Sequence, residues 1–312
     1  MTRLETVGIV GLGRMGGGMC RTLLRAGIDV VAWDLAEPAR EQARTDGARI
    51  AADPAALADL TRTVVLSLPD AHAVNDVLFG ERGLIHDGSR VELVLDTSTT
   101  LPREARELAA AAAARGVEFL DAPLSGGVRG AETGTLAVMV GGSAEAFERA
   151  RPVASIIGRT VVHCGPAGAG QVAKACNQLI VMATLEAVAE TLVLADEAGL
   201  DPRRIREVLM SGLAASPILE NQGLRMIERD FVPGGRCIFH LKDIATIREL
   251  ATEAGLDLPV FDASAARMEQ LVDACGGELD HSAIVTTVER RPLGRRDDAA
   301  PAAPAAPADQ RH

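Results

Sequence analysis

The sequence predicts an α/β fold in which a doubly wound sheet domain is followed by an all-α C-terminal domain, with a long interdomain helix between them. Strand and helix patterns alternate from about residue 6 to residue 165, which is typical of a parallel sheet covered by helices on both faces. A glycine-rich turn directly follows the first strand. After residue 165 the strand patterns stop and only helical patterns remain.

The composition limits the classes of partner. The 312 residues, 47% of them hydrophobic and 24% charged, are enough for two soluble domains with separate cores. A formal charge of -11 without a concentrated basic patch argues against nucleic acid or an anionic membrane and favours a small-molecule partner. The five cysteines are widely spaced without a C-x-x-C motif, so we expect free thiols and no metal site. The N-terminus leads almost directly into a strand, so we expect a cytoplasmic location.

The first strand and turn predict a dinucleotide site. Thr6 to Val10 is a β-branched run, and a helix-compatible stretch extends from the turn to Arg25. In this Rossmann-type pattern one glycine makes the tight turn, one leaves room for a pyrophosphate and one lets the helix pack on the strand. Free N–H groups at the helix N-terminus bind the phosphates. The predicted cofactor-binding residues of the turn are Gly11, Leu12, Gly13, Arg14, Met15 and Gly16.

An acidic residue ends the second strand and indicates which dinucleotide binds. The strand from Asp29 to Trp33 is followed by Asp34, 18 residues after Gly16. A carboxylate at this spacing accepts hydrogen bonds from the adenine-ribose hydroxyls and repels a 2′-phosphate. Asp34 therefore favours NAD over NADP. The alternative is that Asp34 is a solvated loop acid.

Two later strands extend the predicted cofactor site. Thr63 to Leu68 and Leu93 to Asp96 read as strands, and ligands of open parallel sheets lie beyond the carboxyl ends of strands. Leu68, Pro69 and Thr99 are therefore placed along the cofactor. The alternative is that the Ser and Thr residues after Asp96 cap the following helix.

A glycine pair follows the next strand. Val117 to Leu120 leads to Asp121 and then to Ser125, Gly126 and Gly127. Adjacent glycines leave backbone N–H groups uncovered, which suits a carboxylate, although a surface turn has the same composition. Further strands, with a helix between them that Ser143 caps, complete a first domain predicted to span residues 1–165.

The long helix carries a single polar face. Gln171, Lys174, Asn177 and Gln178 are spaced by three and four residues, and the other positions from Val172 to Ala198 are mostly apolar. The pattern predicts a helix buried on all sides, in which a lysine is costly to bury unless it is used. The alternative is a lysine that extends to solvent. Such a helix also favours a homodimer or homotetramer.

The remaining sequence predicts a helical domain at residues 166–290. Residues 291–312 are rich in proline and alanine, have no apolar periodicity and are predicted to be disordered.

The sequence resembles the β-hydroxyacid dehydrogenases, the family of 3-hydroxyisobutyrate dehydrogenase and tartronate semialdehyde reductase, over about residues 4–290. The resemblance rests on four motifs in order. These are Gly-Leu-Gly-Arg-Met-Gly at 11–16, Asp-Ala-Pro-Leu-Ser-Gly-Gly at 121–127, Gly-Ala-Gly-Gln-Val-Ala-Lys-Ala-Cys-Asn at 168–177 and Leu-Lys-Asp at 241–243. It implies reversible NAD-dependent oxidation of a small 3-hydroxy carboxylate to its semialdehyde.

The resemblance also implies residue roles. Lys174 matches the catalytic acid/base, and Asn177, one turn on, matches the asparagine that helps to hold the substrate. The substrate carboxylate is bound in the family by the residues matching Ser125, Gly126 and Gly127. Family cofactor contacts match Leu68, Pro69 and Thr99, and a lysine near the nicotinamide matches Lys242.

Two other functions compete with this one. An imine or other carbonyl reductase can use the same scaffold, but the chain has no tyrosine to act as the proton donor of some imine reductases, and position 174 is lysine rather than their aspartate. A non-catalytic dinucleotide-binding protein needs the glycine turn but not Lys174 and Asn177. Gly235 stands where members with this tail pattern usually have phenylalanine, so the identity of the hydroxyacid is not predicted.

Overall fold

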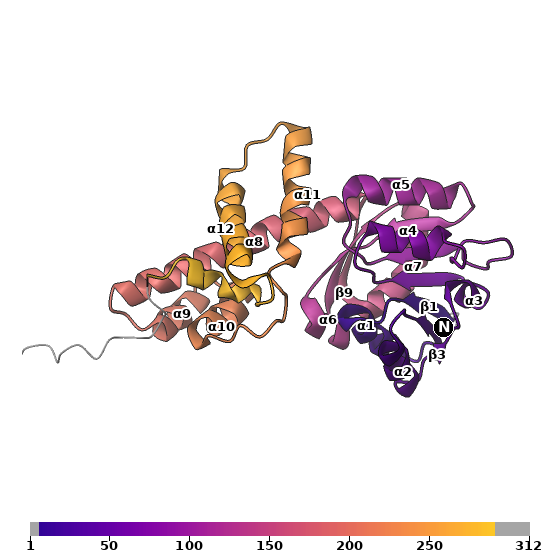
Figure 1. Cartoon of the computed structure of the whole chain (residues 1–312), viewed down its shortest axis with the longest axis horizontal. Helices are drawn as coiled ribbons and strands as arrows, with labels where there is room; N and C mark the ends of the chain where they lie inside the picture. The colour runs from indigo at the N-terminus through magenta and orange to yellow at the C-terminus, as the bar shows by residue number, and fades with distance from the viewer. Residues whose placement is uncertain (1–5, 291–312) are drawn as a thin grey trace, which may run out of the picture.

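The computed structural model describes residues 6–290 and contains a sheet domain and a helical domain joined by one long helix (Figure 1). The predicted disordered tail, 291–312, lies outside the described residues. The strands are β1 (Val7–Val10), β2 (Val30–Trp33), β3 (Arg49–Ile50), β4 (Thr63–Leu66), β5 (Leu93–Asp96), β6 (Glu118–Asp121), β7 (Leu124–Ser125), β8 (Leu136–Gly141) and β9 (Gly158–Gly165).

The strand order confirms the predicted doubly wound sheet. The strands lie in the order β3-β2-β1-β4-β5-β6-β8-β7, with β9 paired to β8, and β3 to β6 are parallel. The order reverses between β1 and β4, where such sheets bind ligands beyond the strand ends. The glycine turn after β1 lies at this point.

Helices cover both faces of the sheet. The apolar cluster on one face includes Met19, Ala131 and Val153, and the cluster on the other face includes Leu57 and Leu78. These clusters are packed by α1 (Arg14–Arg25), α6 (Gly127–Thr133) and α7 (Ala144–Ile157) on the first face and by α3 (Pro54–Ala58), α4 (Ala71–Phe79) and α5 (Pro102–Ala113) on the second; α2 (Glu37–Thr45) lies between β2 and β3 in the chain.

The far edge of the sheet differs from the parallel prediction. β8 runs antiparallel to β6 and β7, and Leu124–Ser125 is a short strand rather than part of a loop. Only a seven-residue helix, α6, lies between β7 and β8, and so short a connection favours antiparallel neighbours. β4 is also shorter than predicted, because the N–H of Leu68 donates to Ser98 Oγ (2.9 Å) instead of continuing the strand ladder.

After the sheet, the chain is helical as predicted. The elements are α8 (Ala169–Glu197), α9 (Pro202–Met210), a π-helical turn (Ile218–Gln222), α10 (Gly223–Glu228), α11 (Phe239–Ala254), α12 (Pro259–Cys275) and the 3-10 helix η2 (His281–Thr287). α8 extends from the sheet domain into the helical domain, where the other helices lie around it and α11 is nearest the sheet domain (Figure 1).

The prediction that α8 is buried on all sides is wrong within one chain. Met182, Leu185 and Leu192 are buried in the core of the helical domain, but Ile180 is 65% exposed and Leu194 71% exposed. Apolar residues on every side do not reveal whether the same chain covers them. α8 is long and apolar enough to cross a membrane, yet its buried side packs against α11, α12 and η2 as in a core helix.

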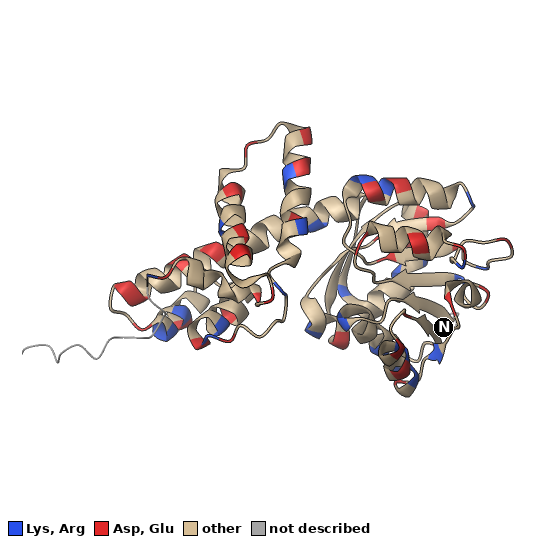
Figure 2. Cartoon of the chain, viewed as in Figure 1, with Lys and Arg blue, Asp and Glu red and all other residues tan. Residues whose placement is uncertain are grey.

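Charged residues of both signs are interspersed over both domains (Figure 2). All five cysteines are free thiols. The sulfur atoms of Cys237 and Cys275 lie 3.6 Å apart, which is contact distance rather than a bond.

Candidate active site

The glycine turn has the geometry of a phosphate-binding loop. Gly11 has a φ of +89°, and a Cβ on Gly16 would lie 1.9 Å from the carbonyl oxygen of Gly11. A Cβ on Gly13 would meet no atom within 4 Å, so the chain leaves space in front of this residue at the N-terminus of α1. These features fit a dinucleotide pyrophosphate.

Asp34 directly follows β2 and contacts the same turn. Its carboxylate accepts a hydrogen bond from the N–H of Leu12 (2.6 Å) and another from the N–H of Ala36 (2.8 Å). The Arg40 guanidinium donates to the main-chain oxygen of Asp34, and Glu37 pairs with the same guanidinium. The structure therefore places Asp34 beside the phosphate turn in a fixed orientation.

The loops after β4 and β5 are tied together. Ser98 accepts from the N–H of Leu68. At the start of α5 the carboxylate of Glu104 accepts from the N–H of Leu101, the N-cap residue, so the cap is not a Ser or Thr side chain. Gln171 crosses from α8 to these loops, where its side-chain N–H₂ donates to the oxygen of Ser98 (2.9 Å). The side chain of Gln171 therefore contacts the loop after β5, whereas it was predicted to form one polar face with Lys174.

A buried carboxylate joins the sheet to α8. Asp121, at the end of β6, is fully buried and accepts from the N–H groups of Gly168 (2.7 Å) and Gln171 (2.9 Å). Burial raises the pKa of Asp121, and these hydrogen bonds oppose the rise. The carboxylate of Asp121 lies beside the first turn of α8, where a negative charge complements the helix dipole. Asp121 therefore holds the start of the helix that carries Lys174.

The Ser-Gly-Gly turn requires glycine. Gly126 and Gly127 have backbone φ angles of +128° and +62°, which residues other than glycine rarely adopt. Ser125 ends β7 and is partly exposed, while Leu124 before it is buried.

Lys174 lies against this turn. Its Nζ donates to the main-chain oxygen of Leu124 (2.8 Å) and to Oε1 of Gln178 (3.1 Å). The Asn177 side-chain N–H₂ donates to the same Oε1 (2.8 Å). Burial lowers the pKa of Lys174; Asp243 opposes this effect and Lys242 adds to it. The structure thus brings together the lysine, the asparagine and the start of the Ser-Gly-Gly turn, and the lysine does not extend to solvent.

Lys242 reaches from the helical domain to the sheet domain. Its Nζ donates to the main-chain oxygens of Thr99 and Pro69, in the loops after β5 and β4. The predicted residues Thr99, Pro69 and Lys242 therefore form one group. Asp96, also at the end of β5, is fully buried, and burial raises its pKa to about 7.

Two family models match the chain on either side of this site. The family described as the NAD binding domain of 6-phosphogluconate dehydrogenase matches residues 6–165, and the family described as NAD-binding of NADP-dependent 3-hydroxyisobutyrate dehydrogenase matches residues 168–288. The chain is 37% identical to 2-hydroxy-3-oxopropionate reductase of Escherichia coli over 287 residues, which cover 91% of this chain and 97% of that protein.

The chain belongs to the β-hydroxyacid dehydrogenase family. It is also 42% identical to 3-hydroxyisobutyrate dehydrogenase of Pseudomonas aeruginosa over 206 residues, covering 66% of this chain and 69% of that protein. The solved structure of Mycobacterium tuberculosis 3-hydroxyisobutyrate dehydrogenase with L-serine has a TM-score of 0.82 and 30% identity, covering 92% of this chain and 99% of that chain. The chain is accordingly an NAD-binding oxidoreductase that acts on the CH–OH group of hydroxyacids.

This β-hydroxyacid dehydrogenase carries a signal that motif analysis missed. Of its 32 lysine and arginine residues, two are lysines and the other 30 are arginines. The two are Lys174 and Lys242, and both lie at the candidate site. Arginine stays protonated at any working pH, whereas the pKa of a buried lysine can fall far enough for proton transfer.

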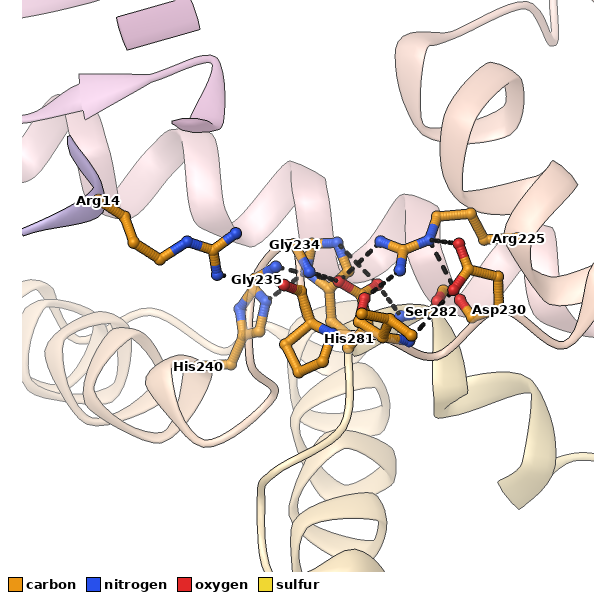
Figure 3. Close-up of polar contacts among 11 residues, drawn as sticks. Arg14, Arg225, Asp230, Gly234, Gly235, His240, His281 and Ser282 are labelled. Atoms are coloured by element: carbon orange, nitrogen blue, oxygen red, sulfur yellow. Dashed lines mark hydrogen bonds and ion pairs between the residues drawn. The ribbon is translucent and has the colours of Figure 1, made fainter. Parts of the chain in front are cut away.

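A second polar cluster was also missed. Arg225 (2.9 Å) and the N–H of Gly234 (2.8 Å) contact Oδ2 of the buried Asp280, which follows α12. Figure 3 labels Arg225 and Gly234, with His240 and His281 close to them. The adjacent His281 lies 2.9 Å, nitrogen to nitrogen, from His240 on α11. Each of these three contacts joins residues at least 41 positions apart in the sequence, so no local sequence pattern predicts the cluster.

Proposed function

We propose that the protein interconverts a small 3-hydroxy carboxylate, similar to 3-hydroxyisobutyrate, and its semialdehyde, with Lys174 as the general acid/base. The observation that carries this proposal is the partly buried amine of Lys174, which donates to the main-chain oxygen of Leu124 directly before Ser125 and the two glycines. A proton-transfer group next to an anion-binding turn suits a substrate that has a hydroxyl two carbons from a carboxylate.

Lys174 moves the proton in either direction. In oxidation the neutral amine accepts the hydroxyl proton while the carbon gives up a hydride; in reduction the ammonium returns the proton to the carbonyl oxygen. NAD, when bound to the turn of residues 11–16, supplies the hydride acceptor. Burial lowers the pKa of Lys174, and the charge of Lys242 lowers it further, so both favour the neutral amine that oxidation needs.

The other site residues position the reactants. Ser125 and the N–H groups of Gly126 and Gly127 bind the substrate carboxylate. Asn177 binds the part of the substrate that carries the hydroxyl. Leu68, Pro69 and Thr99 would line the bound cofactor, and Lys242 would lie near its nicotinamide. The contacts between Lys242 and the loops after β4 and β5 support this placement.

The test is a panel of 3-hydroxyisobutyrate, glycerate and 4-hydroxybutyrate with NAD and NADP, followed at the nicotinamide absorbance. We expect turnover of at least one acid and no reduction of a cyclic imine. Imine reduction without hydroxyacid oxidation would contradict the proposal.

Asp34 is expected to select NAD. Its carboxylate accepts hydrogen bonds from Leu12 and Ala36, and its negative charge would repel a 2′-phosphate. Asp34→Ser should therefore raise the NADP to NAD ratio of kcat/KM by about tenfold or more. Asp29→Ser, at the other end of the same strand, is the matched control and should leave the ratio unchanged. An unchanged ratio in Asp34→Ser would contradict the role.

We also propose that residues 1–165 and 166–290 form the two domains and that the protein is a cytoplasmic homodimer or homotetramer. The exposed Ile180 and Leu194 on α8 support an assembly, because a second copy would cover them. Light scattering of the purified chain measures the assembly, and a monomer would contradict it.

A further inference from the structure

The side chain of Gln178 connects two groups of polar residues. Its Oε1 accepts hydrogen bonds from Lys174 Nζ (3.1 Å) and from the Asn177 side chain (2.8 Å), and its Nε2 donates to Oδ2 of Asp243 (2.6 Å). All three hydrogen bonds are partly buried.

These contacts fix which way the amide points. The reversed amide would set an N–H₂ group against two donors, Lys174 and Asn177, and an oxygen against the carboxylate of Asp243. Each of these arrangements leaves a partly buried polar group unpaired, and the penalty for a fully buried one is about 1–3 kcal/mol. Asp243 therefore determines the orientation of Gln178.

The charges around Lys174 come from α11. Asp243 and Lys242 are adjacent there, and His240 precedes them with Nδ1 3.5 Å from Asp243 Oδ2. Burial lowers the pKa of His240 and of its partner His281 to about 4, so both imidazoles are neutral at pH 7. Asp280 lies beyond His281, 4.0 Å from its ring.

Burial raises the pKa of Asp243, whereas Gln178, Lys174 and Lys242 favour its ionised form. Since the two imidazoles are neutral, Asp243 is the acidic group that faces Lys174, and its negative charge raises the pKa of that amine. It acts on Lys174 in two ways, by orienting Gln178 and by attracting a proton to the amine.

We propose that Gln178, oriented by Asp243, is a positioning residue that aims Lys174 and Asn177 at the substrate, and that Asp243 sets the pH at which Lys174 exchanges its proton. This inference rests on the proposed function for its kinetic consequence. The effect of Gln178 and Asp243 on the pKa of the Lys174 amine can be measured without turnover.

Three variants separate orientation from charge. Gln178→Met keeps the length of the side chain but loses all three contacts, so kcat/KM should fall about 10- to 100-fold. Gln178→Glu keeps an acceptor for Lys174 but adds a charge that repels Asp243. Asp243→Asn keeps an acceptor for Gln178 and removes the charge. Gln270→Met, at an exposed position of α12, is the matched control.

The chain's two lysines allow a direct measurement. Lysine labelled with ¹³C at Cε gives two side-chain resonances in the whole protein, and a Lys174→Arg variant identifies that of Lys174. We expect its titration to shift to higher pH in Gln178→Glu and to lower pH in Asp243→Asn. When both substitutions are combined, the amide introduced at position 243 can donate to the carboxylate introduced at position 178, and one negative charge remains. The titration and the turnover of this double variant should therefore both return toward the wild type.

Turnover of Gln178→Met within twofold of the wild type, together with unchanged Lys174 titrations in both charge variants, would overturn the inference. If the wild-type protein oxidises no hydroxyacid, the proposed function fails, but the titrations still decide whether Asp243 and Gln178 control Lys174. Gln270→Met should match the wild type in both measurements.

Discussion

Lys174→Ala is expected to lower kcat for hydroxyacid oxidation about 10³-fold, within the range of about 10²–10⁴ for general acid/base groups. The reason is that the amine lies beside the Ser-Gly-Gly turn and has its pKa lowered by burial. The change removes proton transfer but leaves the glycine turn intact. NADH binding, measured by its fluorescence on the protein, should therefore be retained.

Two variants complete this test. Lys174→Arg keeps the charge but presents a guanidinium that does not release its proton, so it should be as inactive as alanine. Cys176→Ser changes an exposed residue of the same helix and should keep turnover within about twofold. Near-normal turnover of Lys174→Ala would show that another group transfers the proton.

Asp121→Ala is expected to destabilise the protein by about 3 kcal/mol, because it leaves the N–H groups of Gly168 and Gln171 without their buried charged acceptor. The start of α8 loses its anchor on the sheet, so activity should fall as well. Urea unfolding, followed by the fluorescence of the single tryptophan, Trp33, measures the loss.

A matched capping residue calibrates this effect. Asp201 caps α9 by accepting from the N–H of Arg203 (2.9 Å) but is solvent-exposed, so Asp201→Ala should cost about 1 kcal/mol and leave activity unchanged. Equal losses in the two variants would mean that Asp121 acts only as an ordinary cap.

The sequence was sufficient where the chemistry is local. The turn from Gly11 to Gly16 and the spacing to Asp34 predict the start of the sheet. The glycines are required by the local backbone, through the positive φ of Gly11 and the close approach of Gly16 to Gly11. The cap at Ser143 was equally predictable, since Ser143 lies three residues from Ala146 and accepts a hydrogen bond from its N–H.

Long-range contacts were not readable. The link between Gln178 and Asp243 joins residues 65 positions apart, and Asp121 meets the start of α8 across about 50. The apolar run of α8 was misread for a different reason: Ile180 and Leu194 are apolar yet exposed in the single chain. Hydrophobic periodicity reports that a face avoids water, not which molecule covers it.

The most direct test of the account compares one pKa measured in two ways. Oxidation needs the neutral amine, so kcat/KM for oxidation should rise with pH through the pKa of Lys174 and then level off, and the rate of reduction should fall over the same range. We predict that the inflection coincides with the ¹³C titration of Lys174 and lies below the ordinary lysine value of 10.5. An inflection that differs from that titration, or one that persists in Lys174→Arg, would contradict the assignment of Lys174 as the general acid/base.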